Sequence, residues 1–284
     1  MTNSLEQFKK NLYIQKNNHA PIFYIYGNPG MGKSSLAASF PDPFFLMTEV
    51  AFPSDDRLQG RSIHIDTYEK LMDNLRLIYR VLKDNSFTIK TLVIDNISGI
   101  EHLISNDYFM KEQKRLDELP FAGGHKIVKQ RWCEPKGIYD AIKCINEDFG
   151  VAIILIDHCS IASTSLPNKD TFNRYVPATY PIVYTNLIKL IDEVMFIDVL
   201  YQDRIEEGNF GKKNLKVTAS SKGLLIRSGN GQPEYVSKSR YGLPTQIIYR
   251  EGEGFTCLKD LLPKWYEDTE KEIQEISNTS IEEE

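Results

Sequence analysis

The sequence predicts an α/β fold in which helices flank a mostly parallel central sheet, with antiparallel strands added near the C-terminal end. Short apolar runs have the composition of buried parallel strands, and stretches with helical periodicity separate them. Strands and helices that alternate in this way are typical of a parallel sheet with crossover helices. With 284 residues, 41% of them hydrophobic, the chain is long enough to bury one large core.

The expected elements follow one another along most of the chain. The apolar runs are residues 22–26, 44–47, 91–94 and 151–156. The helical stretches between them are residues 34–40, 67–84 and 135–150. Antiparallel strands or hairpins are expected over residues 192–203, 214–228 and 234–250. Two segments break the pattern. Residues 106–133 begin with a helix-like piece and continue as an irregular stretch, and residues 160–185 are expected to be irregular. Segments of this length inside a compact domain are often functional.

The two ends of the chain differ in composition from the part between them. Residues 1–20 are polar, contain a short amphipathic helix expected over 4–15, and do not have the pattern of a signal peptide. Residues 267–284 contain eight acidic residues and one lysine, whereas the whole chain carries a net charge of −5. We therefore expect an N-terminal helical segment (1–20), an α/β core (21–266) and an acidic, disordered tail (267–284).

Cysteine use and hydropathy favour a cytoplasmic protein. The four cysteines lie far apart without a C-x-x-C pair, which argues against a disulfide framework and against a zinc site. No apolar run approaches the roughly 20 residues that are needed to span a bilayer. We expect no membrane partner.

The stretch GNPGMGKS, residues 27–34, matches the pattern G-x-x-x-x-G-K-[ST] between an expected strand and an expected helix. Glycines in this pattern let backbone N–H groups close around a phosphate, the lysine reaches the β- and γ-phosphates, and the hydroxyl binds Mg²⁺. The sequence therefore predicts ATP and Mg²⁺ as cofactors, with Lys33 also catalytic. The predicted ATP ligands in this stretch are Gly27, Asn28, Pro29, Gly30, Met31, Gly32, Lys33, Ser34 and Ser35.

Polar side chains follow three further strands of the expected sheet. Asp95 ends "TLVID", where it would bind ATP-associated Mg²⁺ together with Ser34. The next residue is Asn96, so a carboxylate that orients the attacking water must come from elsewhere. Glu49 in "FFLMTEV" and His158 in "IILIDH" are the catalytic candidates, because the carboxyl ends of parallel strands gather on the ligand side of a sheet. A solvated carboxylate and an ordinary histidine remain the alternatives.

The order of these motifs resembles that of the RecA-like ATPases, and specifically the phage RecA-core family of recombination and single-strand annealing proteins. The quoted stretches are the P-loop, "FLMTE", "LVIDN", "IILIDH" and "SKSRYGLP", spread over roughly residues 22–244. The resemblance implies a RecA-like P-loop NTPase fold. It implies that Glu49 is the catalytic glutamate, Asp95 the Walker B aspartate, and His158 the residue at the sensor position.

The resemblance also has consequences for topology and assembly. It implies that the sensor strand lies between the P-loop strand and the Walker B strand. It further implies a homo-oligomer in which Lys238 and Arg240, in "SKSRYGLP", reach the ATP of a neighbouring subunit.

In RecA-like proteins the loops after the Walker B helix and after the sensor strand face DNA, and both expected irregular segments occupy these places. The candidate DNA-binding residues are Lys126, Lys129 and Arg131 in the first segment, and Lys169 and Arg174 in the second. Basic residues interleaved with aromatic ones suit a single strand, because cations follow phosphates while rings stack on unpaired bases. The alternative is a pair of solvated loops with ordinary lysines.

The predicted function is a Mg²⁺-ATP-dependent, DNA-stimulated ATPase that binds single-stranded DNA in phage-type homologous recombination or single-strand annealing. For a phage-encoded protein the compartment would be the host cytoplasm, and a single-strand DNA-binding protein is a candidate partner. Two other classes stay open: a small-molecule P-loop kinase, and an adaptor gated by nucleotide with little turnover.

Overall fold

A computed structural model describes residues 20–49, 61–112, 123–165, 170–207, 213–229, 231–250 and 252–267 of the chain. The helices are α2 (Lys33–Ala38), α3 (Tyr68–Lys83), α4 (Ile97–Glu112), α5 (Gly123–Cys133), α6 (Ile138–Phe149), α7 (Pro181–Leu187) and α8 (Thr256–Lys259). The strands are β1 (Ile22–Gly27), β2 (Pro43–Met47), β3 (Ser62–His64), β4 (Thr91–Asp95), β5 (Ala152–Thr164), β6 (Phe172–Pro177), β7 (Glu193–Glu207), β8 (Lys213–Arg227), β9 (Lys238–Ser239) and β10 (Gln246–Tyr249). The helix expected over 4–15 and the acidic tail beyond 267 lie outside the described residues.

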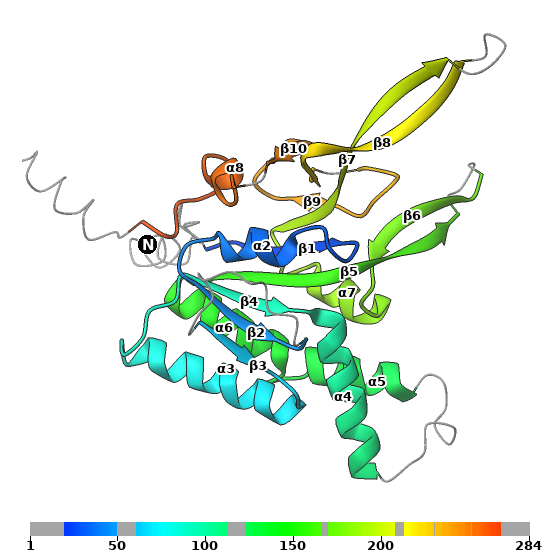
Figure 1. The fold of residues 1–284 in the computed structure, drawn as a ribbon. Coiled ribbons are helices and arrows are strands. Elements are labelled where there is room, and N and C mark those ends of the chain that lie inside the picture. Colours follow the sequence, from blue (N-terminus) through cyan, green and yellow to red (C-terminus); the bar gives the residue numbers. More distant parts are fainter. Residues whose placement is uncertain are drawn as a thin grey trace, which may run out of the picture.

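The strands form one sheet in the order β10-β8-β7-β1-β5-β4-β2-β3, with β6 attached to β5 and β9 to β7. Neighbours from β7 to β3 in this order pair in parallel, and β8 and β10 extend the sheet with antiparallel pairing (Figure 1). The predicted fold class is confirmed. β5 lies between β1 and β4, as the resemblance implied for the sensor, P-loop and Walker B strands.

Two hydrophobic cores lie on the two faces of this sheet. Side chains of α3 to α7 pack on one face, and α2, α8 and the segment around Trp265 pack on the other. All six residues of β1 are buried, which explains why its sequence is apolar throughout rather than alternating. On α3, Leu71, Leu75 and Ile78 form the buried stripe, and the hydroxyl of Thr67 caps the helix by accepting a hydrogen bond from the backbone of Lys70.

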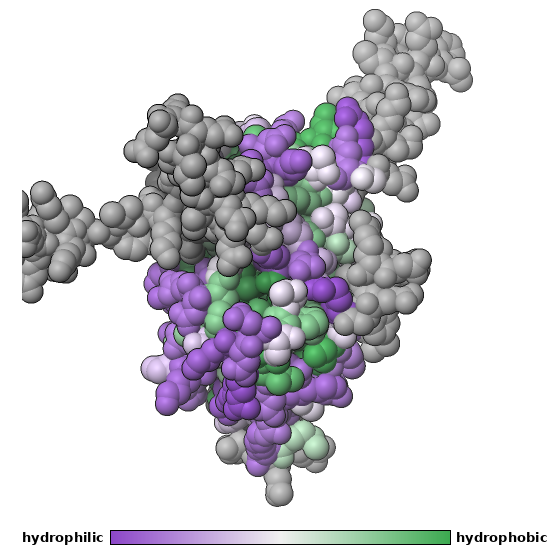
Figure 2. Space-filling model, turned by 90° about the vertical axis from the view of Figure 1, so that its left-hand side faces the viewer, coloured by the Kyte–Doolittle hydropathy of each residue, from purple (hydrophilic) through white to green (hydrophobic). Residues whose placement is uncertain are grey.

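Figure 2 shows the molecule from the side at which the parallel strands begin. The described surface is mostly hydrophilic there, with a smaller hydrophobic area near its centre. Within the described ranges, no helix has the length and apolar content needed to cross a membrane.

The helix-like piece expected after residue 106 is confirmed, because residues 106–112 continue α4. The irregular structure expected for the rest was wrong wherever the structure describes it: residues 123–133 form α5, and residues 160–185 contain the end of β5, all of β6 and the first residues of α7. Residues 113–122 and 166–169 lie outside the described residues. β5 and β6 form an antiparallel hairpin from Cys159↔Pro177 to Thr164↔Phe172. A projecting two-stranded ribbon buries little, so its sequence need not alternate between apolar and polar residues. β7 also departs from expectation, because its first residues pair in parallel with β1 before it turns to β8.

Candidate nucleotide site

A cavity of about 460 Å³ opens where β1, β2, β4 and β5 end. This volume is in the usual range for small-molecule sites. Its lining residues are Pro29, Gly30, Met31, Gly32, Lys33, Ser34, Ser35, Met47, Glu49, Asp95, Asn96 and His158. The structure therefore brings the predicted P-loop residues together with the three polar side chains predicted at strand ends.

The loop between β1 and α2 has the shape of a phosphate cradle. Gly30 and Gly32 have positive φ angles of 77° and 71°, which side chains other than glycine rarely adopt. The Nζ of Lys33 lies inside the loop and donates to the carbonyl oxygens of Gly27 and Asn28, both at 2.9 Å. Burial lowers the pKa of Lys33, although nearby carboxylates, above all Asp95, act against this. A buried ammonium held only by carbonyls suits an incoming phosphate, which would supply the missing anion.

Ser34 and Asp95 form a pair of oxygen donors at the same end of the cavity. The Oγ of Ser34 donates to Oδ2 of Asp95 at 2.5 Å. Burial raises the pKa of Asp95, and the hydrogen bond from Ser34 opposes this shift. Hydroxyl and carboxylate oxygens are ligands that Mg²⁺ prefers, with phosphate oxygens and water completing its shell. The described residues contain no cluster of three His, Cys, Asp or Glu side chains that would hold a metal by itself.

Glu49 is held by two side chains on neighbouring strands. Its Oε1 accepts a hydrogen bond from Nδ2 of Asn96 at 2.7 Å and lies 3.3 Å from Nε2 of His158. Burial alone would raise the pKa of Glu49, but the hydrogen bonds from Asn96 and His158 outweigh it and lower this pKa. Nε2 of His158 also lies 3.0 Å from Nδ2 of Asn96, so its tautomer decides whether it accepts from Asn96 or donates to Glu49.

Asn96 has a role that the sequence did not reveal. Its Oδ1 accepts from the backbone N–H of Gly99 at 2.6 Å, which caps α4, while its Nδ2 binds Glu49. A Cβ on Gly99 would lie 2.7 Å from Cβ of Thr48, so only glycine lets α4 approach β2 this closely. The local sequence signal for this role is weak, because it consists of a polar residue directly after a buried strand.

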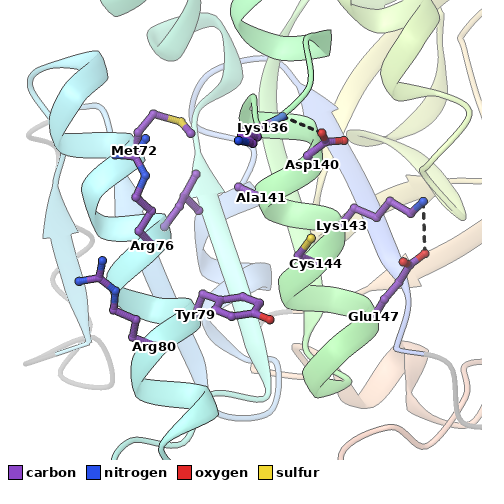
Figure 3. Close-up of a pocket in the computed structure, with 11 residues that line it drawn as sticks. Met72, Arg76, Tyr79, Arg80, Lys136, Asp140, Ala141, Lys143, Cys144 and Glu147 are labelled. Carbon is purple, nitrogen blue, oxygen red and sulfur yellow. Dashed lines mark hydrogen bonds and ion pairs between the residues drawn. The ribbon is translucent and has the colours of Figure 1, made fainter.

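A second cavity, of about 620 Å³, lies between α3 and α6 (Figure 3). Its floor includes Met72 and Leu75, and charged side chains surround it. Two of these, Lys143 and Glu147, lie 3.7 Å apart as an ion pair. This groove contains neither a glycine-rich loop nor a convergent set of polar groups, so the smaller cavity at the strand ends is the better candidate for chemistry.

A family profile described as an AAA domain matches residues 19–241. The chain belongs to this AAA-domain family. The match covers most of the chain, including the P-loop and the strands that end in Asp95 and His158. This AAA domain is thus a nucleotide-binding protein of the P-loop ATPase type. Proteins of this type usually bind their nucleotide together with Mg²⁺. No curated protein matches the chain in sequence.

In this AAA domain Lys238 and Arg240 lie far from their own P-loop. Lys238 pairs with Val194 near the start of β7, whereas the P-loop follows the end of β1. The Nζ of Lys238 donates to the carbonyls of Ile188 and Ile191, and Arg240 forms an ion pair of 2.8 Å with Asp192. Both side chains therefore have partners within the chain, and their contact with a neighbouring subunit stays a prediction.

The predicted DNA-binding residues of the AAA domain fall into three groups. Lys126 and Lys129 are exposed on α5. Arg131 lies with its guanidinium 5.1 Å from the ring of Tyr68, and Arg174 donates to two backbone carbonyls of the segment 232–235. Lys169 lies outside the described residues. The structure thus accounts for Arg131 and Arg174 without DNA, whereas the two lysines of α5 face solvent.

Proposed function

We propose that this AAA domain is a Mg²⁺-ATP-dependent ATPase that binds single-stranded DNA and acts in phage-type homologous recombination or single-strand annealing. The observation that carries the proposal is the course of β5. This strand pairs in parallel with β1 as far as His158, and from Cys159 onward it pairs with β6 in the projecting hairpin (Figure 1). One continuous strand therefore links the nucleotide cavity with a surface that a DNA strand can reach.

The geometry supports hydrolysis with Glu49 as the general base. Glu49 would orient a water against the terminal phosphate and accept its proton as the phosphate is attacked; its lowered pKa makes it a weak base that is ionised at neutral pH, which suits the orienting role. Asn96 and His158 would hold Oε1 so that Oε2 faces the water. Lys33, Ser34 and Asp95 would hold the phosphates and the metal, and bound Mg²⁺ supplies neutralisation of charge on the phosphate oxygens.

Two exposed surfaces support single-stranded DNA as the ligand. Ile161 on the hairpin is 64% exposed, as suits an apolar contact with an unpaired base. α5 carries Lys126 and Lys129, and it contacts the segment between the hairpin and α7 through the ring of His125, 4.0 Å from that of Tyr180. Exposed cations suit the phosphates of a single strand, and an exposed apolar side chain suits its unpaired bases.

The proposal includes a homo-oligomer in which Lys238 and Arg240 contact the nucleotide of a neighbouring subunit. Their position supports this arrangement, because β9 pairs with the first residues of β7, at the end of the strands opposite the P-loop. Within one subunit neither side chain can reach the phosphates, so any contact with nucleotide must be made between subunits.

The test is steady-state phosphate release with no DNA, with oligo-dT and with duplex DNA. We expect single-stranded DNA to stimulate the rate, and we expect Glu49→Gln to bind a fluorescent ATP analogue normally and to lose turnover. Glu147→Gln, an exposed carboxylate on α6, is the matched control and should hydrolyse ATP at the normal rate. Unchanged hydrolysis by the Glu49 variant would move the base role to another residue.

A salt series locates the DNA contacts. For a single strand, each phosphate contact adds about 0.7 to the magnitude of the negative slope of log K against log salt. The double variant Lys126→Ala, Lys129→Ala should therefore reduce the magnitude of this slope by about 1.4. The pair Lys70→Ala and Lys83→Ala on α3 is the control and should leave the slope unchanged. Phosphate transfer to a nucleoside would favour the kinase alternative, and negligible phosphate release without DNA binding would favour the adaptor.

A further inference from the structure

Thr179 lies between β6 and α7, where the chain leaves the hairpin, and two buried carboxylates hold it. Its backbone N–H donates to Oδ2 of Asp157 at 2.9 Å, and its hydroxyl donates to Oε1 of Glu101. Thr179 is 3% exposed, Glu101 4% and Asp157 0%. Burying two carboxylates is costly, and the hydrogen bonds that they accept offset this cost.

The first carboxylate belongs to the strand that lines the nucleotide cavity. Asp157 directly precedes His158, and neighbouring residues of a strand point to opposite faces, so Asp157 lies behind the cavity. It accepts hydrogen bonds from the hydroxyl of Tyr24 at 2.8 Å and from the backbone N–H of Ser98 at 3.3 Å. Asp157 therefore serves as an anchor for the surrounding elements, and it does not face the cavity where a base would act.

The second carboxylate belongs to the helix that begins at the cavity. Asn96 binds Glu49 with its amide and caps α4 with its oxygen, and Glu101 follows after little more than one helical turn. Besides the hydroxyl of Thr179, Glu101 accepts the backbone N–H of Tyr180, at 3.0 Å to Oε1 and 3.2 Å to Oε2. Two routes thus lead from the cavity to Thr179, one along β5 and one along α4.

We propose that Glu101 and Asp157 are positioning residues. Through Thr179 they fix the end of the β5–β6 hairpin to β5 and α4, the two elements that lead from the nucleotide cavity. Bound nucleotide thereby sets the affinity of the hairpin for single-stranded DNA. The inference rests on the proposed function, because it takes the hairpin as a DNA-binding element. Glu101 and Asp157 are distinct from the catalytic residues, since neither lines the nucleotide cavity.

The charge of Glu101 is open to titration near neutral pH. Burial raises the pKa of Glu101 to about 7, with hydrogen bonds from Thr179 and Tyr180 acting against this and Asp157 adding to it. The titratable groups that face it are Asp157 on β5, Tyr24 on β1 and Tyr180 before α7, and the ring of His125 of α5 lies against that of Tyr180 at a tilt. A protonated carboxyl has one acceptor position fewer. The hydrogen bonding by which Glu101 holds Thr179 and Tyr180 therefore weakens as pH falls from 8 to 6.

The test measures binding of a fluorescein-labelled oligo-dT of about 30 nucleotides, a length that covers several contacts. Its Kd is determined with ADP and with a slowly hydrolysed ATP analogue, and the ratio of the two Kd values is the coupling. Thr179→Val keeps the shape and removes the hydroxyl, so it should lower the coupling about tenfold, within the usual size of such couplings. Thr179→Ser keeps the hydroxyl and should retain the coupling. Basal ATPase rate and nucleotide affinity should stay within about twofold in both variants.

A pH series separates positioning from a merely structural role. The coupling of the natural chain should fall between pH 8 and pH 6, and Glu101→Gln should remove this dependence on pH. Full coupling in Thr179→Val, or an unchanged pH profile in Glu101→Gln, would overturn the inference while the proposed function stands. DNA binding that is equal with both nucleotides in the natural chain would also overturn it. If oligo-dT does not bind in any nucleotide state, the proposed function itself fails.

Discussion

Glu101→Gln should change the dependence of stability on pH, by an amount that follows from the environment of this carboxyl. The pKa of Glu101 is about 7, against 4.5 for an unperturbed glutamate, mainly because the side chain is buried. Each pKa unit corresponds to about 1.4 kcal/mol, so ionising Glu101 in the folded protein costs about 3 kcal/mol. A raised carboxyl pKa gives stability that is fully present below pH 4.5 and is lost as pH rises through 7.

The glutamine variant does not titrate and escapes this loss. Its amide replaces one acceptor oxygen and brings an N–H group toward the backbone N–H of Tyr180, which costs about 1 kcal/mol at every pH. Relative to the natural chain, the free energy of unfolding of the variant should therefore rise by about 2.5 kcal/mol between pH 5 and pH 8, because part of the loss in the natural chain occurs below pH 5. Urea unfolding followed by tryptophan fluorescence measures it, with Glu147→Gln as an exposed control. A difference between variant and natural chain that stays constant with pH would refute the reasoning.

Three further predictions concern the surrounding architecture. Gly99→Ala should push α4 away from β2 and lower the rate of ATP hydrolysis at least tenfold, while a fluorescent ATP analogue still binds, because a Cβ has no room beside Thr48; a normal rate would show that α4 can shift freely. Arg174→Met should lower the free energy of unfolding by about 1–3 kcal/mol, because the guanidinium bonds two backbone carbonyls; intact stability with weakened DNA binding would instead make Arg174 a DNA ligand. The double variant Lys238→Ala, Arg240→Ala should bind ATP and lose DNA-stimulated hydrolysis, and intact stimulation would end the proposed role between subunits.

The fold was largely predictable because its parallel strands are buried on both faces. β1, β2, β4 and the first part of β5 show this as apolar runs, and the runs end in the polar residues that line the cavity. Since such residues meet at one edge of the sheet, Glu49, Asp95 and His158 could be placed together although more than 100 residues separate the first from the last.

The parts that could not be predicted depend on contacts that leave little trace in a local pattern. The hairpin β5–β6 is a ribbon outside the core, and α5 buries few side chains, with Val128 and Trp132 among them. Glu101 does leave a trace, because it stands four residues after Ile97 and three before Ile104, on the buried stripe of α4. An acidic residue in an apolar stripe indicates a buried partner, but the partner Thr179 is 78 residues away and only the fold identifies it.

The change of partners along β5 has a consequence for how the chain exchanges its amide hydrogens. Residues 153–156 are bonded to β1 on one side and to β4 on the other, whereas beyond Cys159 the strand has β6 beside it. Two-stranded ribbons are only marginally stable in water, so protection should fall by orders of magnitude within a few residues of His158. Opening of the paired residues 160–164 and 172–176 is therefore a local event, and it can occur while the amides next to the nucleotide stay closed.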